Sequence, residues 1–193
     1  MEEELGTIEK NHTWELVTLP HNKRMIGVKW VYKIRVAKGF LQKASLNYNE
    51  VFVPVARIKT IRLVVTTTIF RGWSLHQLDV KSVFLNVSLE EEVYLCQPPS
   101  FEVTRHENKV YKLKKALFGL NQAPRASNRR IDCFLLQLDF NKCTTEYGVY
   151  VRATASDLMI VCLYVNVNVS DLLVIGSNAI DIDEFKRRIM LEF

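Results

Sequence analysis

The stretch from residue 73 to residue 85 limits what this chain can fold into more than any other, because a carboxylate stands where an apolar strand ends. Residues 75–80 predict a buried strand with Asp79 at its tip, and Phe84 follows shortly after it. A carboxylate at a strand end is a good ligand for a hard cation such as Mg²⁺. Taken alone, such an aspartate more often caps a turn, and Phe84 is more typical of an ordinary core side chain. The neighbouring motifs decide between these interpretations.

Four other segments carry strand signals. Residues 24–35 are rich in Val, Ile, Trp and Tyr with alternating basic residues, which predicts one half-exposed strand. Residues 110–115 predict a strand with one apolar and one basic face. The apolar segments 158–165 and 172–176 are separated by a short polar connection, which predicts a β-hairpin. We therefore expect an antiparallel sheet.

Helical periodicity appears in four other segments. Residues 58–70 predict a buried helix that stops near Gly72, although β-branched residues lower its helix propensity. Residues 2–10 and 182–193 predict a short and a final amphipathic helix. A helix over residues 124–139 presents its apolar side chains at the helical period: Ile131, Phe134, Leu135 and Leu138. The predicted fold class is α+β.

Composition agrees with one globular domain. The chain has 193 residues, of which 48% are hydrophobic and 24% charged, so one domain with a substantial core is expected. The net charge of +5 permits a polyanionic partner without requiring one.

The cysteines and the first residues indicate the compartment. The four cysteines are widely spaced, with no Cys-x-x-Cys pair, so we expect reduced thiols rather than disulfides or structural zinc. The acidic amino terminus lacks the layout of a signal peptide, and the longest apolar run, 158–165, is too short to span a bilayer. We expect a cytoplasmic or nuclear protein that is not secreted and does not contact a membrane.

Several motifs occur in a specific order along the chain. Residues 27–33 read Gly-Val-Lys-Trp-Val-Tyr-Lys, residues 91–99 read Glu-Glu-Val-Tyr-Leu-Cys-Gln-Pro-Pro, and residues 117–126 read Leu-Phe-Gly-Leu-Asn-Gln-Ala-Pro-Arg-Ala. Residues 9–17 precede these three motifs, and the stretch around Asp79 lies between the first motif and the second. Over residues 3–193 the chain closely resembles the reverse transcriptase of Ty1/copia-type retrotransposons.

The resemblance implies a polymerase palm with partial fingers, formed by an antiparallel sheet backed by helices. It implies RNA-directed DNA polymerase activity with Mg²⁺ as cofactor, an RNA or DNA template-primer as partner, and deoxynucleotides as substrates. Asp79 matches the first catalytic, metal-binding aspartate of that family, and Asp171 matches the last one. Both are expected to bind the metal.

Three further residues match substrate-binding positions of the family. Phe84 matches the ring that crowds the ribose 2′ position, and Gln122 matches the glutamine that lines the nucleotide pocket. Without the resemblance, Gln122 is equally well explained as a polar residue in a turn. Lys38 remains from the basic residues that grip the triphosphate.

The hairpin tip departs from the family pattern Tyr-Val-Asp-Asp. Here Tyr164 and Val165 are followed by five other residues before Asp171, so either Asn166 or Ser170 stands at the first aspartate. Both supply an uncharged oxygen where the family has the carboxylate that bridges two cations. Losing such a ligand commonly slows a reaction by about a thousandfold or more.

Other departures point the same way. The finger hairpin is expected to be shortened near residues 35–36, and Asn121 and Ser127 stand where the family usually has Lys and Trp. We expect residues 1–193 to form one truncated reverse transcriptase domain without a thumb or RNase H region. The leading hypothesis is a catalytically defective reverse transcriptase fragment. The alternatives are a weakly active polymerase that uses Asp79 and Asp171, and a non-catalytic nucleic-acid-binding remnant that uses the basic residues between 109 and 130.

Overall fold

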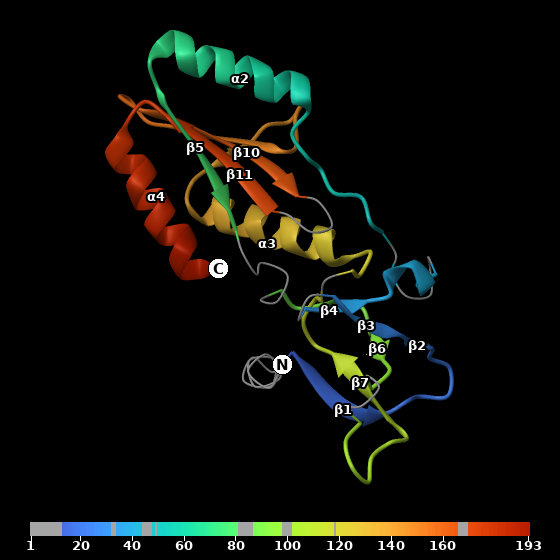
Figure 1. Ribbon diagram of the computed structural model, residues 1–193. Helices are drawn as coiled ribbons and strands as arrows, with labels where there is room; N and C mark the ends of the chain where they lie inside the picture. The colour runs from blue at the N-terminus through green and yellow to red at the C-terminus, as the bar shows by residue number, and fades with distance from the viewer. Residues whose placement is uncertain are drawn as a thin grey trace. The chain divides into compact units, whose positions relative to one another are not determined.

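The computed structural model describes residues 13–31, 34–43, 48, 50–80, 87–97, 102–117, 119–165 and 170–193. The chain divides into two compact units, and each is described by itself (Figure 1). Unit 1 combines Met1–Phe52 with Phe84–Ala126, and unit 2 combines Val53–Val83 with Ser127–Phe193. Helices and mostly antiparallel sheets make the chain α+β, as predicted.

Unit 1 contains a four-stranded sheet in the order β1 (Trp14–Thr18), β7 (Lys109–Leu113), β6 (Tyr94–Leu95) and β2 (Met25–Ile26). Only the β2–β6 pair is parallel. A buried apolar cluster lies against this sheet, formed by Ile26, Ala37, Val93, Leu95, Leu113, Ala116, Leu117, Leu120 and Ala123. Unit 1 therefore has its own core.

The single strand predicted over residues 24–35 is wrong. The chain forms β2, then β3 (Val28–Val31), and reverses into β4 (Ile34–Ala37), which pairs antiparallel with β3. A 3₁₀ turn, η1 (Gly39–Leu41), follows directly. Strand composition continues through the reversal without Gly, Pro or Asn, so no turn signal marked it in the sequence.

Unit 2 contains a five-stranded antiparallel sheet in the order β5 (Ser74–Asp79), β11 (Ser170–Gly176), β10 (Leu158–Val165), β9 (Val149–Ala153) and β8 (Asn141–Lys142). The predicted hairpin is confirmed as β10 and β11, and the strand that ends at Asp79 is confirmed as β5. The prediction that this strand is buried is wrong, because β5 lies at the edge of the sheet and its side chains are half-buried or exposed. The strands β8 and β9 were not predicted. They are short, and they pair with residues that follow them in the chain.

Helix α2 (Ile58–Arg71) covers one face of this sheet, and α3 (Ala123–Gln137) and α4 (Ala179–Glu192) lie on the other (Figure 1). One side of α2 packs Ile61 and Val64 against a buried cluster that includes Cys162. The prediction that α2 is buried is wrong for its outer side, where Leu63 and Ile69 are 67% and 77% exposed. A helix on one face of a sheet buries only one stripe of side chains.

Helix α3 carries most of the predicted core. Ile131 and Leu135 are fully buried and Phe134 is 8% exposed, whereas Leu138 is half-buried and lies beyond the end of the helix. Helix α4 begins earlier than predicted, because the side chain of Asn178 accepts a hydrogen bond from the backbone of Ile180 and caps the helix. The helix predicted over residues 2–10 lies outside the described residues. In the described part of the chain no helix is long and apolar enough to cross a membrane.

Candidate cation and nucleotide sites

The two aspartates predicted to bind metal are direct partners on neighbouring strands. β5 ends at Asp79, β11 begins one residue before Asp171, and the register pairs Asp79 with Asp171. Directly opposed residues of antiparallel strands have Cα atoms about 4.5–5.5 Å apart and side chains on the same face. The expected adjacency of the two strand ends is confirmed. The metal-binding role of the two residues stays a prediction.

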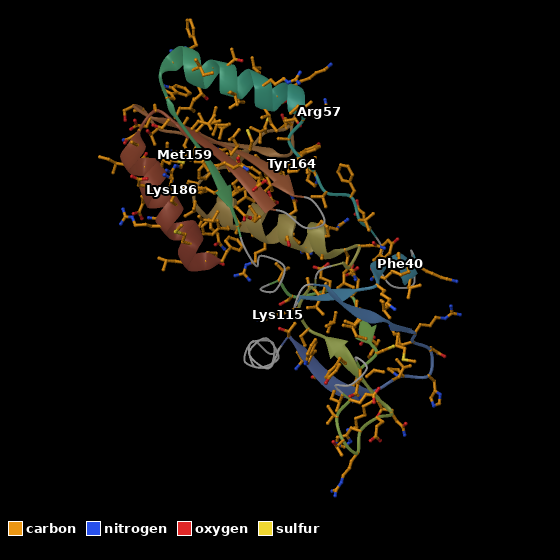
Figure 2. The ribbon with its side chains drawn as sticks, in the orientation of Figure 1. Phe40, Arg57, Lys115, Met159, Tyr164 and Lys186 are labelled. Atoms are coloured by element: carbon orange, nitrogen blue, oxygen red, sulfur yellow. The ribbon has the colours of Figure 1, made fainter. Side chains whose placement is uncertain are left out.

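Tyr164 extends this row onto a third strand. It pairs with Asp171 at the carboxyl-terminal end of β10, where its side chain is 45% exposed (Figure 2). The same face of the sheet meets α2 further along the strands, where Cys162 and Leu173 pack with the helix. Asp79 and Asp171, which we call the acidic pair, therefore lie beyond the part of the sheet that α2 covers. Asp79 is exposed and Asp171 is half-buried.

The donor set of this pair fits one hydrated cation. Mg²⁺ commonly binds proteins through one or two carboxylates and keeps several water ligands. Two carboxylates on opposed strand residues provide such a set. In residues 13–193, leaving aside the segments not described, no group of three or more His, Cys, Asp or Glu side chains could hold a metal ion.

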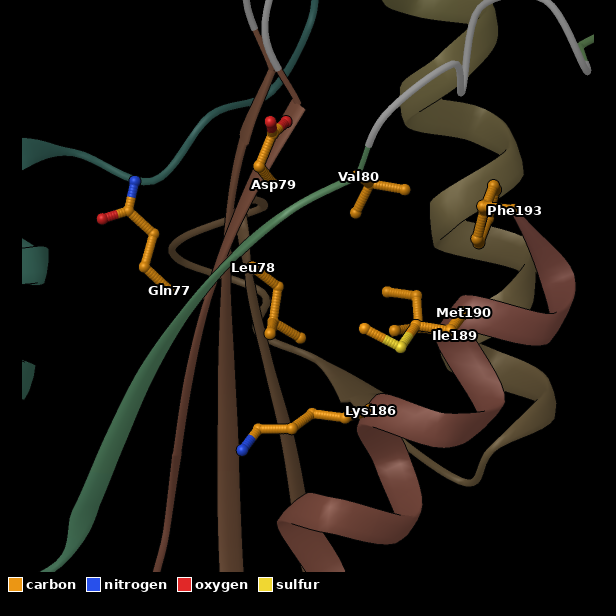
Figure 3. A pocket seen from close by; sticks show the side chains of 8 residues that line it. All are labelled: Gln77, Leu78, Asp79, Val80, Lys186, Ile189, Met190 and Phe193. Carbon is orange, nitrogen blue, oxygen red and sulfur yellow. The ribbon is translucent and has the colours of Figure 1, made fainter.

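A cavity of about 580 Å³ lies beside the acidic pair, between the end of β5 and α4. Leu78 and Val80 point toward Ile189 and Met190 of α4, whereas Gln77 points away from that helix (Figure 3). The residues that line the cavity are Gln77, Leu78, Asp79, Val80, Lys186, Ile189, Met190 and Phe193. Asp171 does not contribute to it. The cavity borders Asp79 but does not coincide with the acidic pair.

Lys38 lies in unit 1, in the segment that links β4 to η1. Its backbone N–H donates to the carbonyl of Gly27 at 2.9 Å. Its side chain runs over Gly27, where an added Cβ would lie 3.1 Å from the Lys38 Cδ. The absence of a side chain at Gly27 thus leaves room for the half-buried Lys38 stem.

Gln122 also lies in unit 1, and its side chain is buried. It is 1% exposed, and its Oε1 accepts a hydrogen bond from the Gln42 Nε2 at 2.9 Å. The Gln42 Oε1 in turn accepts the backbone N–H of Asn121 at 2.9 Å. Gln42 was not predicted from the sequence. Its partners lie about eighty positions away and no local pattern connects them.

Three other positions named from the sequence have different outcomes. Phe84 and Asn166 lie outside the described residues. Ser127, which stands where the family usually has Trp, is fully buried in α3, and its hydroxyl has no hydrogen-bond partner in the described structure. A buried hydroxyl without a partner is a stability cost, so this position is not optimised for serine.

Much of the basic cluster between residues 109 and 130 is engaged in ion pairs. Lys112 contacts Glu92 at 2.9 Å and Lys114 contacts Glu15 at 2.7 Å. Arg125 pairs with Glu50, and Arg130 pairs with Glu192. Hydrogen bonds from Lys112 and Lys23 lower the pKa of Glu92 to about 2. These carboxylates reduce the positive charge that the cluster offers to a phosphate backbone.

Comparison with known proteins identifies the family. The family described as reverse transcriptase (RNA-dependent DNA polymerase) matches residues 11–193. The retrovirus-related Pol polyprotein from transposon TNT 1-94 of Nicotiana tabacum is 36% identical over an alignment that covers 92% of this chain and 14% of that protein. The corresponding polyproteins from transposons RE1 and RE2 of Arabidopsis thaliana are 35% and 34% identical, and 87% and 88% of this chain is covered.

The chain spans only 12–14% of the length of these relatives. Both the family match and the identities extend over most of the chain. This chain belongs to the copia-type reverse transcriptases of retrotransposon Pol polyproteins.

Proposed function

We propose that this chain is the palm, with partial fingers, of a copia-type reverse transcriptase that keeps a site for one divalent cation but does not catalyse templated DNA synthesis. The observation that carries the proposal is the register that opposes Asp79 and Asp171 at neighbouring strand ends. Membership of the family implies a nucleic acid template and nucleotide substrates, and reverse transcriptases generally use a divalent metal.

The defect follows from the charges at the hairpin. Polymerase sites of the two-metal type need several carboxylates, because these ligands together offset the charge of two cations and hold both in place. The sequence between Tyr164 and Asp171 contains no carboxylate, and Asn166 or Ser170 takes the place of the aspartate that bridges the cations in the family. A missing bridging ligand costs about a thousandfold or more in rate.

The remaining residues have binding roles in this proposal. Asp79 and Asp171 hold one cation, which when bound would neutralise phosphate charge. In unit 1, Lys38 binds the triphosphate, and the buried Gln122 belongs to the packing that supports the nucleotide site rather than to its surface. Phe84 keeps the role that the resemblance implies, next to the sugar.

Primer extension tests the proposal directly. The purified chain should not extend a primed RNA template with deoxynucleotides and Mg²⁺. Replacing residues 166–171 by Asp-Asp should give at most partial activity, because the shortened finger hairpin remains. Steady incorporation by the unmodified chain that Asp79→Asn abolishes would overturn the proposal in favour of a weakly active polymerase.

The alternative of a nucleic-acid-binding remnant has less support, because Lys112, Lys114 and Arg125 have carboxylate partners. Binding to a primer-template duplex at several salt concentrations separates the two. A remnant that binds through many phosphate contacts would lose affinity steeply as salt rises, with a slope close to the number of contacts. A weak dependence of affinity on salt concentration agrees with a basic surface whose charges are mostly paired with carboxylates.

A further inference from the structure

In unit 1 a buried pair of glutamines joins two segments that are distant in the sequence. Gln42 is 8% exposed and Gln122 is 1% exposed. The Gln42 Nε2 donates to the Gln122 Oε1 at 2.9 Å, and the Gln42 Oε1 accepts the backbone N–H of Asn121 at 2.9 Å. The carboxamide of Gln42 therefore uses its donor and its acceptor on the same short turn.

The backbones of the same two segments are in close contact. A Cβ added to Gly39 would lie 1.9 Å from the carbonyl oxygen of Gly119, so only glycine fits at position 39. The Asn121 Nδ2 donates to the carbonyl of Gly39 at 3.1 Å. Gly119 itself has a φ of 87°, a left-handed conformation that favours glycine. Residues 39–42 and 119–122 thus pack directly against each other, and we name these two segments together the glutamine lock.

Two residues of the proposed nucleotide site lie in or next to the glutamine lock: Gln122 is within it, and Lys38 is adjacent to it. Lys38 directly precedes Gly39, and its carbonyl accepts the N–H of Leu41 within η1. Gln122 is a member of the lock, but its side chain is too buried to form a direct contact with a nucleotide in this arrangement. Gln122 therefore acts on the segment that carries Lys38 rather than on a ligand.

We infer that Gln42 is a positioning residue for nucleotide binding: through Gln122 and Asn121 it holds the Lys38 segment in the arrangement that receives a triphosphate. The inference rests on the proposed function for the role of Lys38. The physical reason is preorganisation, because a segment already held in its binding arrangement loses less conformational entropy when the ligand binds. Methionine has the size of glutamine but neither hydrogen-bonding group, so Gln42→Met removes both hydrogen bonds of the Gln42 side chain.

The test compares Gln42→Met with Gln137→Met, the same change at an exposed glutamine at the end of α3. Affinity for dATP with Mg²⁺ is measured by titration calorimetry at a temperature where each variant is folded. Gln42→Met should weaken binding by about tenfold, the effect of losing two neutral hydrogen bonds. Gln137→Met should bind as the unmodified chain does. Amide hydrogen exchange should show loss of protection at Asn121 in Gln42→Met alone.

A cycle with Lys38→Met separates positioning from a general loss of stability. If Gln42 acts through the Lys38 segment, the double variant binds dATP no more weakly than Lys38→Met, so the effects are not additive. Unchanged dATP affinity in folded Gln42→Met overturns the inference and leaves the proposed function intact. Full additivity in the cycle also overturns it. An unmodified chain that does not bind dATP overturns the nucleotide role of Lys38, and the inference with it.

Discussion

The opposed carboxylates of Asp79 and Asp171 give a direct test of the cation site. Like charges at directly opposed strand positions destabilise a sheet, by about 0.2–1 kcal/mol for an exposed pair. For two charges about 5 Å apart, Coulomb's law with the dielectric constant of water gives about 0.8 kcal/mol. Asp79 is exposed, so the water value applies better than that of a protein interior. Asp79→Asn should therefore raise the free energy of unfolding by about 0.5–1 kcal/mol in metal-free buffer of low salt.

A bound cation should reverse the order of stability. At a Mg²⁺ concentration ten times its Kd, the unmodified chain gains about 1.4 kcal/mol of stability. Asp79→Asn keeps one carboxylate of the opposed pair and should lose most of this gain. For a chain of this size, 1 kcal/mol corresponds to about 2–4 °C in Tm. Urea denaturation and thermal melts, each with EDTA and with Mg²⁺ or Mn²⁺, measure both effects.

The control is Glu102→Gln, which neutralises an exposed carboxylate that belongs to unit 1 and not to the strands of the acidic pair. It should leave the Mg²⁺ response unchanged. High salt should shrink the gain seen in metal-free buffer, because exposed charges are screened. A variant Asp79→Asn that is less stable than the unmodified chain without metal, and that responds to Mg²⁺ equally well, would show that the two carboxylates form no cation site.

Three further predictions concern the core of unit 2. Leu135→Ala should lower the free energy of unfolding by about 2–5 kcal/mol, whereas Leu136→Ala, at a position 49% exposed, should change it little, as urea denaturation can measure. Burial raises the pKa of Cys162 to about 11 from 9.0. At pH 8 a thiol reagent should therefore modify the exposed Cys133 and spare Cys162 until the chain unfolds. The free energy of unfolding should fall as the pH rises from 9.0 to about 11, because the thiol of Cys162 loses its proton more readily in the unfolded chain. Gly148→Ala should lower Tm, because its Cβ would lie 2.2 Å from the backbone nitrogen of Ala56; an unchanged Tm would contradict this packing.

Strong local signals in the sequence predicted several elements. Helices α2 and α3 follow from apolar residues near the helical period of 3.6, whereas the hairpin of β10 and β11 and the strand that ends at Asp79 follow from short apolar runs next to polar residues. The motifs around Asp79 and Asp171 were likewise sufficient to name both residues as candidates and to identify the family. Each of these signals lies within about fifteen residues, so neighbouring side chains specify it.

Only the tertiary structure decided which distant residues meet. The register that opposes Asp79 and Asp171 depends on how β5 pairs with β11, and the Gln42–Gln122 bond spans eighty positions. The same holds for the ion pairs of the basic cluster and for the burial of Ser127. Such contacts leave no local pattern, because hydrogen bonding and burial depend on which surfaces the folded chain brings together and not on the spacing of residues within one segment.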